Sequence, residues 1–135
     1  MKSFPLQIVT PDKTVLDGEA VSLLIRTTEG DIEILAGHTD LLAALGTGRA
    51  RIRKSEGPDV YASASGGFLS VANGKVRVAA TTFELATELD LERARTAKEK
   101  AEQALRDAKT AKEVNLAKAK LQRALTRINV KMMKY

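Results

Sequence analysis

The stretch FLSVANGKVRV, residues 68–78, decides the fold of this 135-residue chain. Two β-prone runs flank Asn73-Gly74, a pair that tolerates the positive φ angles of a type I′ turn, so the stretch predicts a tight β-hairpin. Gly74 is also the last of the nine glycines, and all three prolines precede it. Because glycine and proline mark turns, we expect a turn-rich β region up to this hairpin and a different structure beyond it.

The region before this break shows the period of two that is typical of half-buried strands. Residues 49–53 alternate three arginines with Ala50 and Ile52, and residues 21–27 form a strongly β-prone run. Many short strands separated by frequent turns indicate an antiparallel sandwich or barrel. We therefore predict an all-β sandwich for residues 1–88.

Beyond residue 88 the period becomes helical, which predicts an α-helical hairpin over residues 89–135. Thr110 and Glu113 fit a capping box, which favours a break near Lys109. Since no glycine or proline enforces that break, one long continuous helix is the alternative. The first helix carries a narrow stripe of small residues and the second a stripe of mostly larger ones: Ala94, Ala97, Ala101, Ala104, Ala108 and Ala111, then Val114, Ala117, Leu121, Leu125, Ile128 and Met132.

Charge divides the chain at the same point. Residues 1–88 have a net charge of −2, whereas residues 89–135 carry 13 Lys and Arg against 6 Asp and Glu, a net charge of +7. This basic arm indicates either an acidic partner or an ordinary solvated helix face. The lack of cysteine excludes disulfides, and no apolar run reaches the roughly 20 residues of a membrane span. Because no signal-peptide stretch follows Met1, we expect a cytoplasmic protein.

No set of residues supports catalysis, so we expect no enzyme. A single histidine, His38, excludes a multi-histidine metal site, and the absence of cysteine excludes a Cys/His pair. There is no nucleophile-elbow motif and no Walker A loop, and residues 46–48 (Gly-Thr-Gly) are too short for a dinucleotide loop. Nucleic acid is not the expected partner either, because the basic arm has no aromatic residue before Tyr135 to stack on bases.

Several segments, in collinear order over nearly all of the chain, resemble one protein family. It is the epsilon subunit family of rotary F-type ATP synthases. The segments are residues 9–12 (Val-Thr-Pro-Asp), 29–32 (Glu-Gly-Asp-Ile), 37–38 (Gly-His), 65–69 (Ser-Gly-Gly-Phe-Leu) and 89–94 (Leu-Asp-Leu-Glu-Arg-Ala). The order and spacing of these segments are more specific than any one of them.

The resemblance implies a non-catalytic central-stalk subunit of a proton-translocating ATP synthase, peripheral on the cytoplasmic face of a bacterial membrane. In that family the sandwich binds the gamma subunit and the ring of c subunits. The helical arm inhibits ATP hydrolysis when it extends into the catalytic head of alpha and beta subunits. The rival hypotheses are a stand-alone basic adaptor and a small nucleic-acid-binding protein.

The resemblance also implies partner-binding residues in the sandwich. Glu29, Asp31 and His38 stand at positions where the family contacts gamma and the c-ring. For His38 the alternative is a loop residue that holds a turn beside Gly37. The sequence departs from the family at two loop positions, since Glu33 replaces the usual glycine and the residue before Gly37 is not the usual proline.

Some members of the family bind ATP as a regulatory ligand on the folded helix pair. At the matching positions this chain has Glu84, Asp90, Arg93, Lys100, Arg123 and Arg127. Lys100 stands where the nucleotide-binding members carry arginine, whose planar fork lysine does not reproduce. The alternative for Asp90 is a helix cap, where its carboxylate faces the positive end of the helix dipole.

Overall fold

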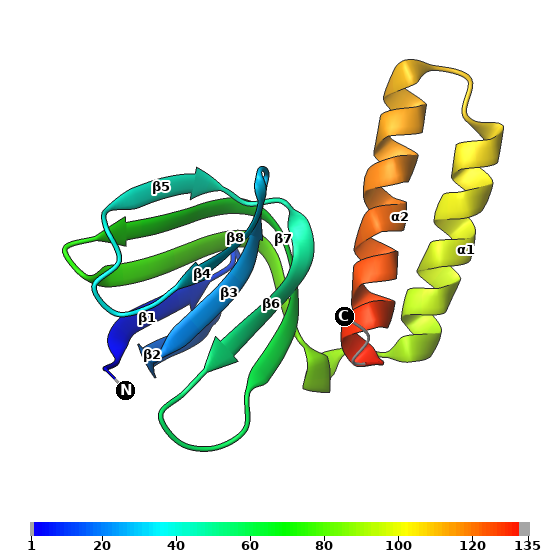
Figure 1. Ribbon diagram of the computed structural model, residues 1–135. Helices are drawn as coiled ribbons and strands as arrows, with labels where there is room; N and C mark the ends of the chain where they lie inside the picture. The colour runs from blue at the N-terminus through cyan, green and yellow to red at the C-terminus, as the bar shows by residue number, and fades with distance from the viewer. Residues whose placement is uncertain (1, 133–135) are drawn as a thin grey trace. The chain divides into compact units, whose positions relative to one another are not determined.

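The computed structural model describes residues 2–132, which divide into two compact units (Figure 1). The first unit ends at Leu85 and the second begins at Ala86. The sequence placed the boundary between residues 88 and 89. The intervening residues form a short 3-10 helix, η1 (Ala86–Glu88), at the start of the second unit.

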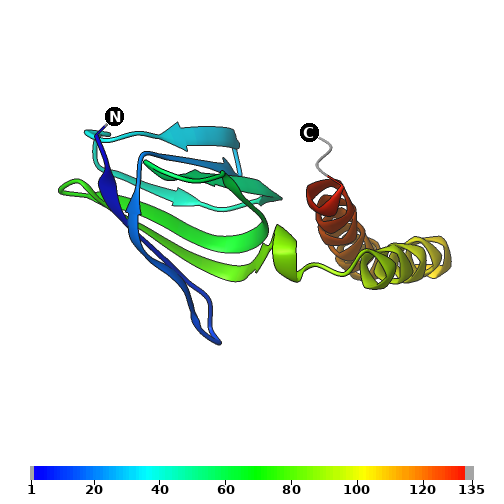
Figure 2. The same cartoon turned by 90° about the horizontal axis from the view of Figure 1, so that it is seen from below.

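The first unit is a β-sandwich of eight strands, as the sequence predicted. Figure 2 shows its strands in two layers. They pair in the order β2-β1-β8-β7-β6-β3-β4, and β5 adds to β7. The strands are β1 (Phe4–Val9), β2 (Thr14–Ala20), β3 (Ser22–Thr27), β4 (Gly30–Ile34), β5 (Leu41–Ala44), β6 (Thr47–Arg53), β7 (Val60–Ala72) and β8 (Lys75–Leu85).

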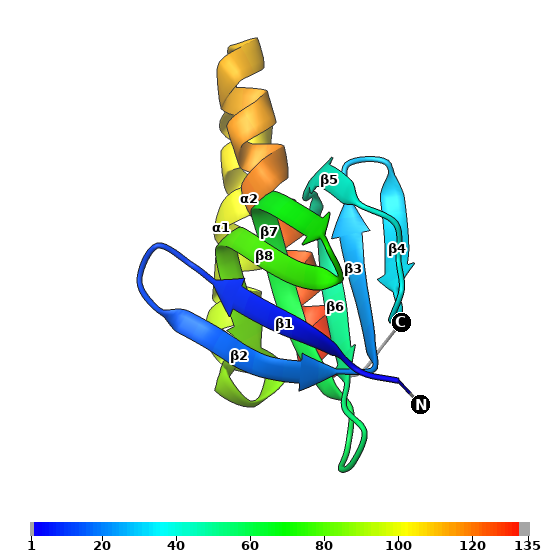
Figure 3. The ribbon, with the colours of Figure 1, turned by 90° about the vertical axis from the view of Figure 1, so that its left-hand side faces the viewer.

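One strand pair differs from the antiparallel arrangement that we expected. β1 runs parallel to β8, with Leu6 opposite Val76 and Val9 opposite Ala79 (Figure 3). A tight turn imposes the antiparallel direction only on the two strands that it joins. β1 and β8 lie at opposite ends of this unit's sequence, so their direction is set by the whole fold rather than by a local signal.

The hairpin of β7 and β8 forms at Asn73-Gly74, which confirms the prediction. Both residues have positive φ, 52° for Asn73 and 78° for Gly74. At 13 and 11 residues the two strands are longer than the sequence indicated. The other edge of β7 pairs first with β6 and then, after Gly66 and Gly67, with β5. These two glycines, with φ of 70° and 96°, lie where β7 passes from one partner to the next.

The apolar core of the sandwich is contributed by every strand that the sequence predicted. Leu6, Ile8, Leu23, Ile25 and Leu69 are fully buried. Most of their neighbours in sequence are more exposed, which is the alternation expected of strands with one face on a core. Ser22, beside Leu23, is an exception, because it is buried too. In β6 the two apolar residues between the arginines are likewise buried, as predicted.

The second unit is an antiparallel pair of helices, α1 (Leu91–Asp107) and α2 (Ala111–Lys131), side by side in Figure 1. Thr110 caps α2, because its Oγ1 accepts a hydrogen bond from the backbone N–H of Glu113 at 3.1 Å. The Glu113 carboxylate reaches back to the N–H of Lys109, also at 3.1 Å. The predicted break is therefore confirmed, and the single continuous helix is wrong.

The helices pack through alanines on both sides. Ala94 and Ala101 are buried on α1, and Ala117 and Ala124 are buried on α2. The expected stripe of larger residues on α2 is wrong at Leu125, which is 39% exposed. Small residues at the contact bring the two helix backbones close together, so the larger side chains lie beside the contact rather than in it.

Candidate functional site

A groove lined by cations lies between the two helices and has a volume of about 370 Å³. We call it the cationic groove. Its alanines come from α1, and their short side chains leave the space open. Long basic side chains from both helices line it as well. The lining residues are Ala97, Lys100, Ala101, Ala104, Lys120, Arg123 and Arg127.

Three of the four cations that line the cationic groove lack an acidic partner among the residues that the structure describes. Lys120, Arg123 and Arg127 share one face of α2 because they are spaced by three and four residues. Lys100 adds a charge from α1. With the residues 2–132 that the structure describes, Lys100, Lys120 and Arg123 form no ion pair and no hydrogen bond. Like charges gathered in this way favour an anionic ligand or an acidic partner.

Three of the six positions implied for ATP therefore meet in one groove: Lys100, Arg123 and Arg127. Arg93 lies exposed on α1 but does not line the groove. Asp90 caps α1, with its Oδ1 accepting from the N–H of Arg93 at 3.2 Å. Glu84 lies on β8, in the sandwich unit, opposite Ser63 of β7.

The three partner-binding positions implied for the sandwich lie in β4 and in the segments on either side of it. Glu29 lies exposed in the turn that leads into this strand, and Asp31 pairs with Arg26 of the neighbouring β3. His38 lies in the loop that follows β4. Its backbone N–H donates a hydrogen bond to the carbonyl oxygen of Leu35 at 3.2 Å, which closes a turn around Gly37. The ring Nδ1 of His38 lies 2.7 Å from the carbonyl oxygen of Thr39.

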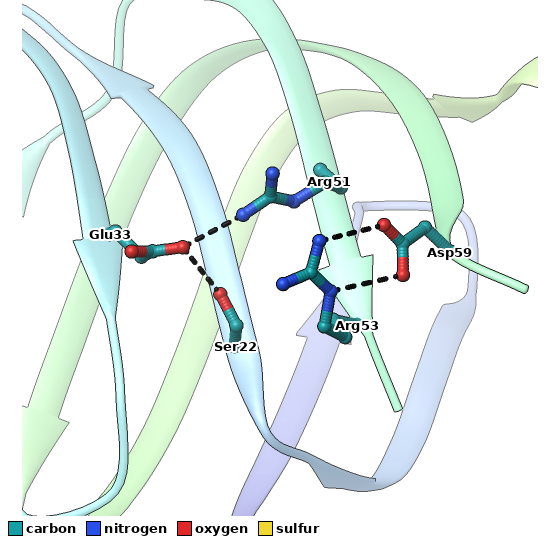
Figure 4. A network of polar contacts seen from close by, with 5 residues as sticks. All are labelled: Ser22, Glu33, Arg51, Arg53 and Asp59. Carbon is teal, nitrogen blue, oxygen red and sulfur yellow. Dashed lines mark hydrogen bonds and ion pairs between the residues drawn. The ribbon is translucent and has the colours of Figure 1, made fainter. Parts of the chain in front are cut away.

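Glu33, the departure from the family's glycine, takes part in a polar network across three strands (Figure 4). Its Oε2 accepts from the hydroxyl of Ser22 on β3 at 2.9 Å and from the guanidinium of Arg51 on β6 at 2.7 Å. Arg53 pairs separately with Asp59, at 3.2 Å. Arg51 and Arg53 are therefore both paired with acids of the same unit, in contrast to Lys100, Lys120 and Arg123 of the cationic groove.

The sandwich also has an exposed apolar patch that was not predicted from the sequence. Leu42 on β5 is 72% exposed and Phe68 on β7 is 58% exposed. Phe68 lies opposite Ala44 on one side and Ala79 on the other, so three strands contribute to this surface. The alternation of side chains along β7 could have indicated this patch. Leu69 and Val71 point into the core, so Phe68 must point outward. Exposed clusters of large apolar residues favour contact with another protein.

Among residues 2–132, no group of three or more His, Cys, Asp or Glu side chains could hold a metal ion. Neither described helix is long and apolar enough to cross a membrane.

Comparison with known proteins assigns both units to one family. Residues 3–86 match the family model "ATP synthase, Delta/Epsilon chain, beta-sandwich domain". Residues 87–132 match "ATP synthase, Delta/Epsilon chain, long alpha-helix domain". The two models follow each other along the chain in the order that the structure shows.

Whole-length relatives agree with these matches. The chain is 39% identical to the ATP synthase epsilon chain of Bacillus cytotoxicus, over 99% of this chain and 100% of that protein. It is 35% identical to the sodium-ion-specific ATP synthase epsilon chain of Propionigenium modestum, over 96% and 94%. It also has the fold of a chain in the mitochondrial ATP synthase of Euglena gracilis, with a TM-score of 0.79 at 24% identity, covering 89% of this chain and 76% of that one. The chain therefore belongs to the family of epsilon subunits of F-type ATP synthases.

Proposed function

We propose that this chain links the rotor of an ATP synthase to its catalytic head and restrains ATP hydrolysis through its helical hairpin. As an epsilon subunit it is a non-catalytic component of that complex. Its proposed place is the central stalk, peripheral on the cytoplasmic face of a bacterial membrane. A structural relative in Tetrahymena thermophila belongs to a central stalk and c-ring assembly, with a TM-score of 0.68.

The observation that carries the proposal is the collinear match of both units. A chain kept only for rotor binding would need the sandwich alone. Here the relatives from Bacillus cytotoxicus and Propionigenium modestum align over 94% or more of both chains, and the helical unit has its own family model. Two folded parts shared with these relatives favour two roles, one for each part.

The proposed role of the sandwich is to bind the gamma subunit and the c-ring. The exposed pair Leu42 and Phe68 offers an apolar centre of the kind that protein interfaces contain. Glu29, exposed in the turn before β4, offers a carboxylate to a basic partner. We propose that Asp31, within β4, and His38, in the loop after it, also contact these partners.

The proposed role of the hairpin is to contact the acidic surface of the alpha and beta subunits. Its support is the net charge of +7 over residues 89–135. In addition, Lys100, Lys120 and Arg123 of the groove have no ion pair with any of residues 2–132. Opposite charge favours such a contact and makes it sensitive to salt.

The decisive experiment removes residues 89–135 from the assembled complex. We expect the complex to keep its rotor and to hydrolyse ATP faster, because the sandwich binds the rotor while the hairpin inhibits. Hydrolysis is measured on purified complexes whose subunit content has been checked on gels. A complex that assembles normally and hydrolyses ATP at the unchanged rate would contradict an inhibitory hairpin.

A second proposed function is ATP binding in the cationic groove, as a regulatory ligand. A triphosphate needs several cations where no glycine-rich loop supplies backbone N–H groups, and the groove has four. Arg123 and Arg127 come from α2 and Lys100 from α1. A bound ATP would therefore hold the two helices together and favour the folded hairpin over any state in which they separate.

The test of ATP binding is the thermal stability of the isolated full chain. We expect ATP to raise the melting temperature, because a ligand that binds only the folded state stabilises it by RT ln(1 + [ATP]/Kd). Arg127→Ala should abolish this shift. Arg106→Ala is the matched control, because Arg106 lies on α1 outside the groove and bonds to Gln103. No shift in the wild-type chain at millimolar ATP would exclude this function.

A further inference from the structure

Lys120 lies at the border between two depressions of opposite charge. It lines the cationic groove, and it also lines a second depression of about 290 Å³. The two depressions share Lys120 and Ala104. The second one is lined by the acids Asp107 and Glu113 and by no other cation.

Both of these acids are already engaged. The carboxylate of Asp107 accepts two hydrogen bonds from the side-chain amide of Gln103, at 3.0 and 3.1 Å. Glu113 accepts from the backbone N–H of Lys109, as part of the cap of α2. Lys120 forms no ion pair with either acid, nor a hydrogen bond with any of residues 2–132. Its ammonium group is therefore left for a ligand in the cationic groove.

The position of Lys120 extends the row of cations on α2. At a rise of about 1.5 Å per residue, it lies about 4.5 Å along the helix from Arg123 and about 10.5 Å from Arg127. Beyond Lys120, towards the loop between the helices, the lining becomes acidic. Lys120 is thus the last cation that an anion lying along the groove can reach on this helix.

The number of cations bears on which anion fits best. At neutral pH a nucleoside diphosphate carries about three negative charges and a triphosphate about four. Of the four cations that the sequence singled out, Arg93 does not line the groove. The three that do, Lys100, Arg123 and Arg127, match the charge of the diphosphate. The fourth negative charge of a triphosphate requires one more cation at the same groove, and Lys120 is the residue that supplies it.

We propose that Lys120 is a phosphate-binding residue of the cationic groove and that it determines the preference for a nucleoside triphosphate over a diphosphate. This inference rests on the proposed binding of ATP. Lys120 acts by adding one charge-assisted hydrogen bond that the longer phosphate chain receives and the shorter one does not.

The experiment is calorimetric titration of the full chain with ATP and with ADP, without Mg²⁺ so that the ligand charge is defined. Lys120→Gln removes the charge and keeps a good helix former, and Lys120→Arg retains the charge. Lys118→Gln is the matched control, because Lys118 is exposed on the same helix and lines neither depression. Circular dichroism of each variant checks that the hairpin stays folded.

We expect Lys120→Gln to weaken ATP binding about tenfold, the loss of one charge-assisted hydrogen bond, and ADP binding about twofold or less. Lys118→Gln should change neither, and Lys120→Arg should preserve the preference for ATP. Equal losses for the two ligands would overturn the role in selectivity. Unchanged ATP binding by Lys120→Gln would overturn the assignment of Lys120 as a ligand residue while leaving the groove intact. A wild-type chain that binds neither ligand would overturn the ATP site itself.

Discussion

Arg26 on β3 binds both carboxylate oxygens of Asp31 on β4, and the two residues are direct cross-strand neighbours. The hydrogen bond from Arg26 lowers the pKa of Asp31, and the charges of Arg26 and Arg49 act in the same direction against partial burial. Asp31, a position proposed for partner binding, is therefore held ionised and in a fixed place before any partner arrives.

The first prediction is that Asp31→Asn destabilises the sandwich in a pH-dependent way. A carboxyl group whose pKa is lower in the folded state stabilises the fold above its unfolded pKa, near 3.9, and this stability is lost as the pH falls through the folded pKa. Because both side chains are partly exposed, we expect a loss of at most about 1 kcal/mol at pH 7. Urea denaturation at a series of pH values measures it.

The control for this prediction is Asp17→Asn. Asp17 is exposed on β2 and has no ion pair with any residue from 2 to 132. Its substitution removes the same charge without breaking a bond, so its effect on urea stability should be close to zero at pH 7. If the difference in unfolding free energy between the two variants persisted undiminished below pH 3, Asp31 would act through packing rather than through its charge.

The second prediction concerns Gly67, where β7 changes partners. Its φ is +96°, and a Cβ placed there would lie 1.9 Å from the carbonyl oxygen of Ala79. Alanine must therefore both adopt a disfavoured conformation and displace the backbone of β8. We expect Gly67→Ala to lower the free energy of unfolding by about 2 kcal/mol or more.

Gly57→Ala separates the two causes. Gly57 has a similar φ of +88°, but nothing lies within 4 Å of the position of its Cβ. Its substitution should lower the free energy of unfolding only by the conformational strain, about 1 kcal/mol. If the two variants were equally stable in urea, the close approach of β8 would have no energetic consequence.

The sequence predicted those elements whose signals are local. The turn at Asn73-Gly74 and the cap at Thr110 each depend on a few adjacent residues, and both form as predicted. The parallel pairing of β1 with β8 has no such local signal. The exposure of Leu125 likewise depends on how closely the alanines of two helices approach, which no single helix pattern determines.

The candidate site was predictable only in part for a related reason. Periodicity placed Arg123 and Arg127 on one face of a helix, but the depth of the groove depends on the alanines of α1. No motif in the sequence singled out Lys120. The structure places it in the lining of the same groove as Lys100, and the nearby acids Asp107 and Glu113 bond to other groups.

The third prediction is that the sandwich folds without the hairpin. All of the residues of its buried cluster, from Phe4 to Phe83, precede the boundary at Leu85. Residues 1–88 alone should therefore unfold cooperatively on heating, followed by circular dichroism. A broad, non-cooperative transition would show that the sandwich requires the helices for its stability.

The last prediction concerns Arg123 and Arg127, for which two roles are proposed: contact with the catalytic head and binding of ATP. The two roles predict opposite changes in the rate of ATP hydrolysis. If Arg123 and Arg127 contact the catalytic head, reversing both to glutamate should release inhibition and raise ATP hydrolysis by the assembled complex. If they served only to bind ATP and hold the hairpin folded, the same change would favour the inhibitory state and lower hydrolysis. Because the proposed inhibition requires contact between the hairpin and the catalytic head, we expect hydrolysis to rise.

Lys112 and Lys118 provide the matched control, since both are exposed on α2 and neither lines the groove. Reversing this pair changes the net charge by the same amount, so a general electrostatic effect would appear in both double variants. Inhibition by the wild-type hairpin should also fade as salt rises from about 0.05 to about 0.5 M, because the Debye length shortens severalfold. Inhibition that is indifferent to salt and to both reversals would show that apolar packing of the hairpin, rather than its charge, holds the catalytic head.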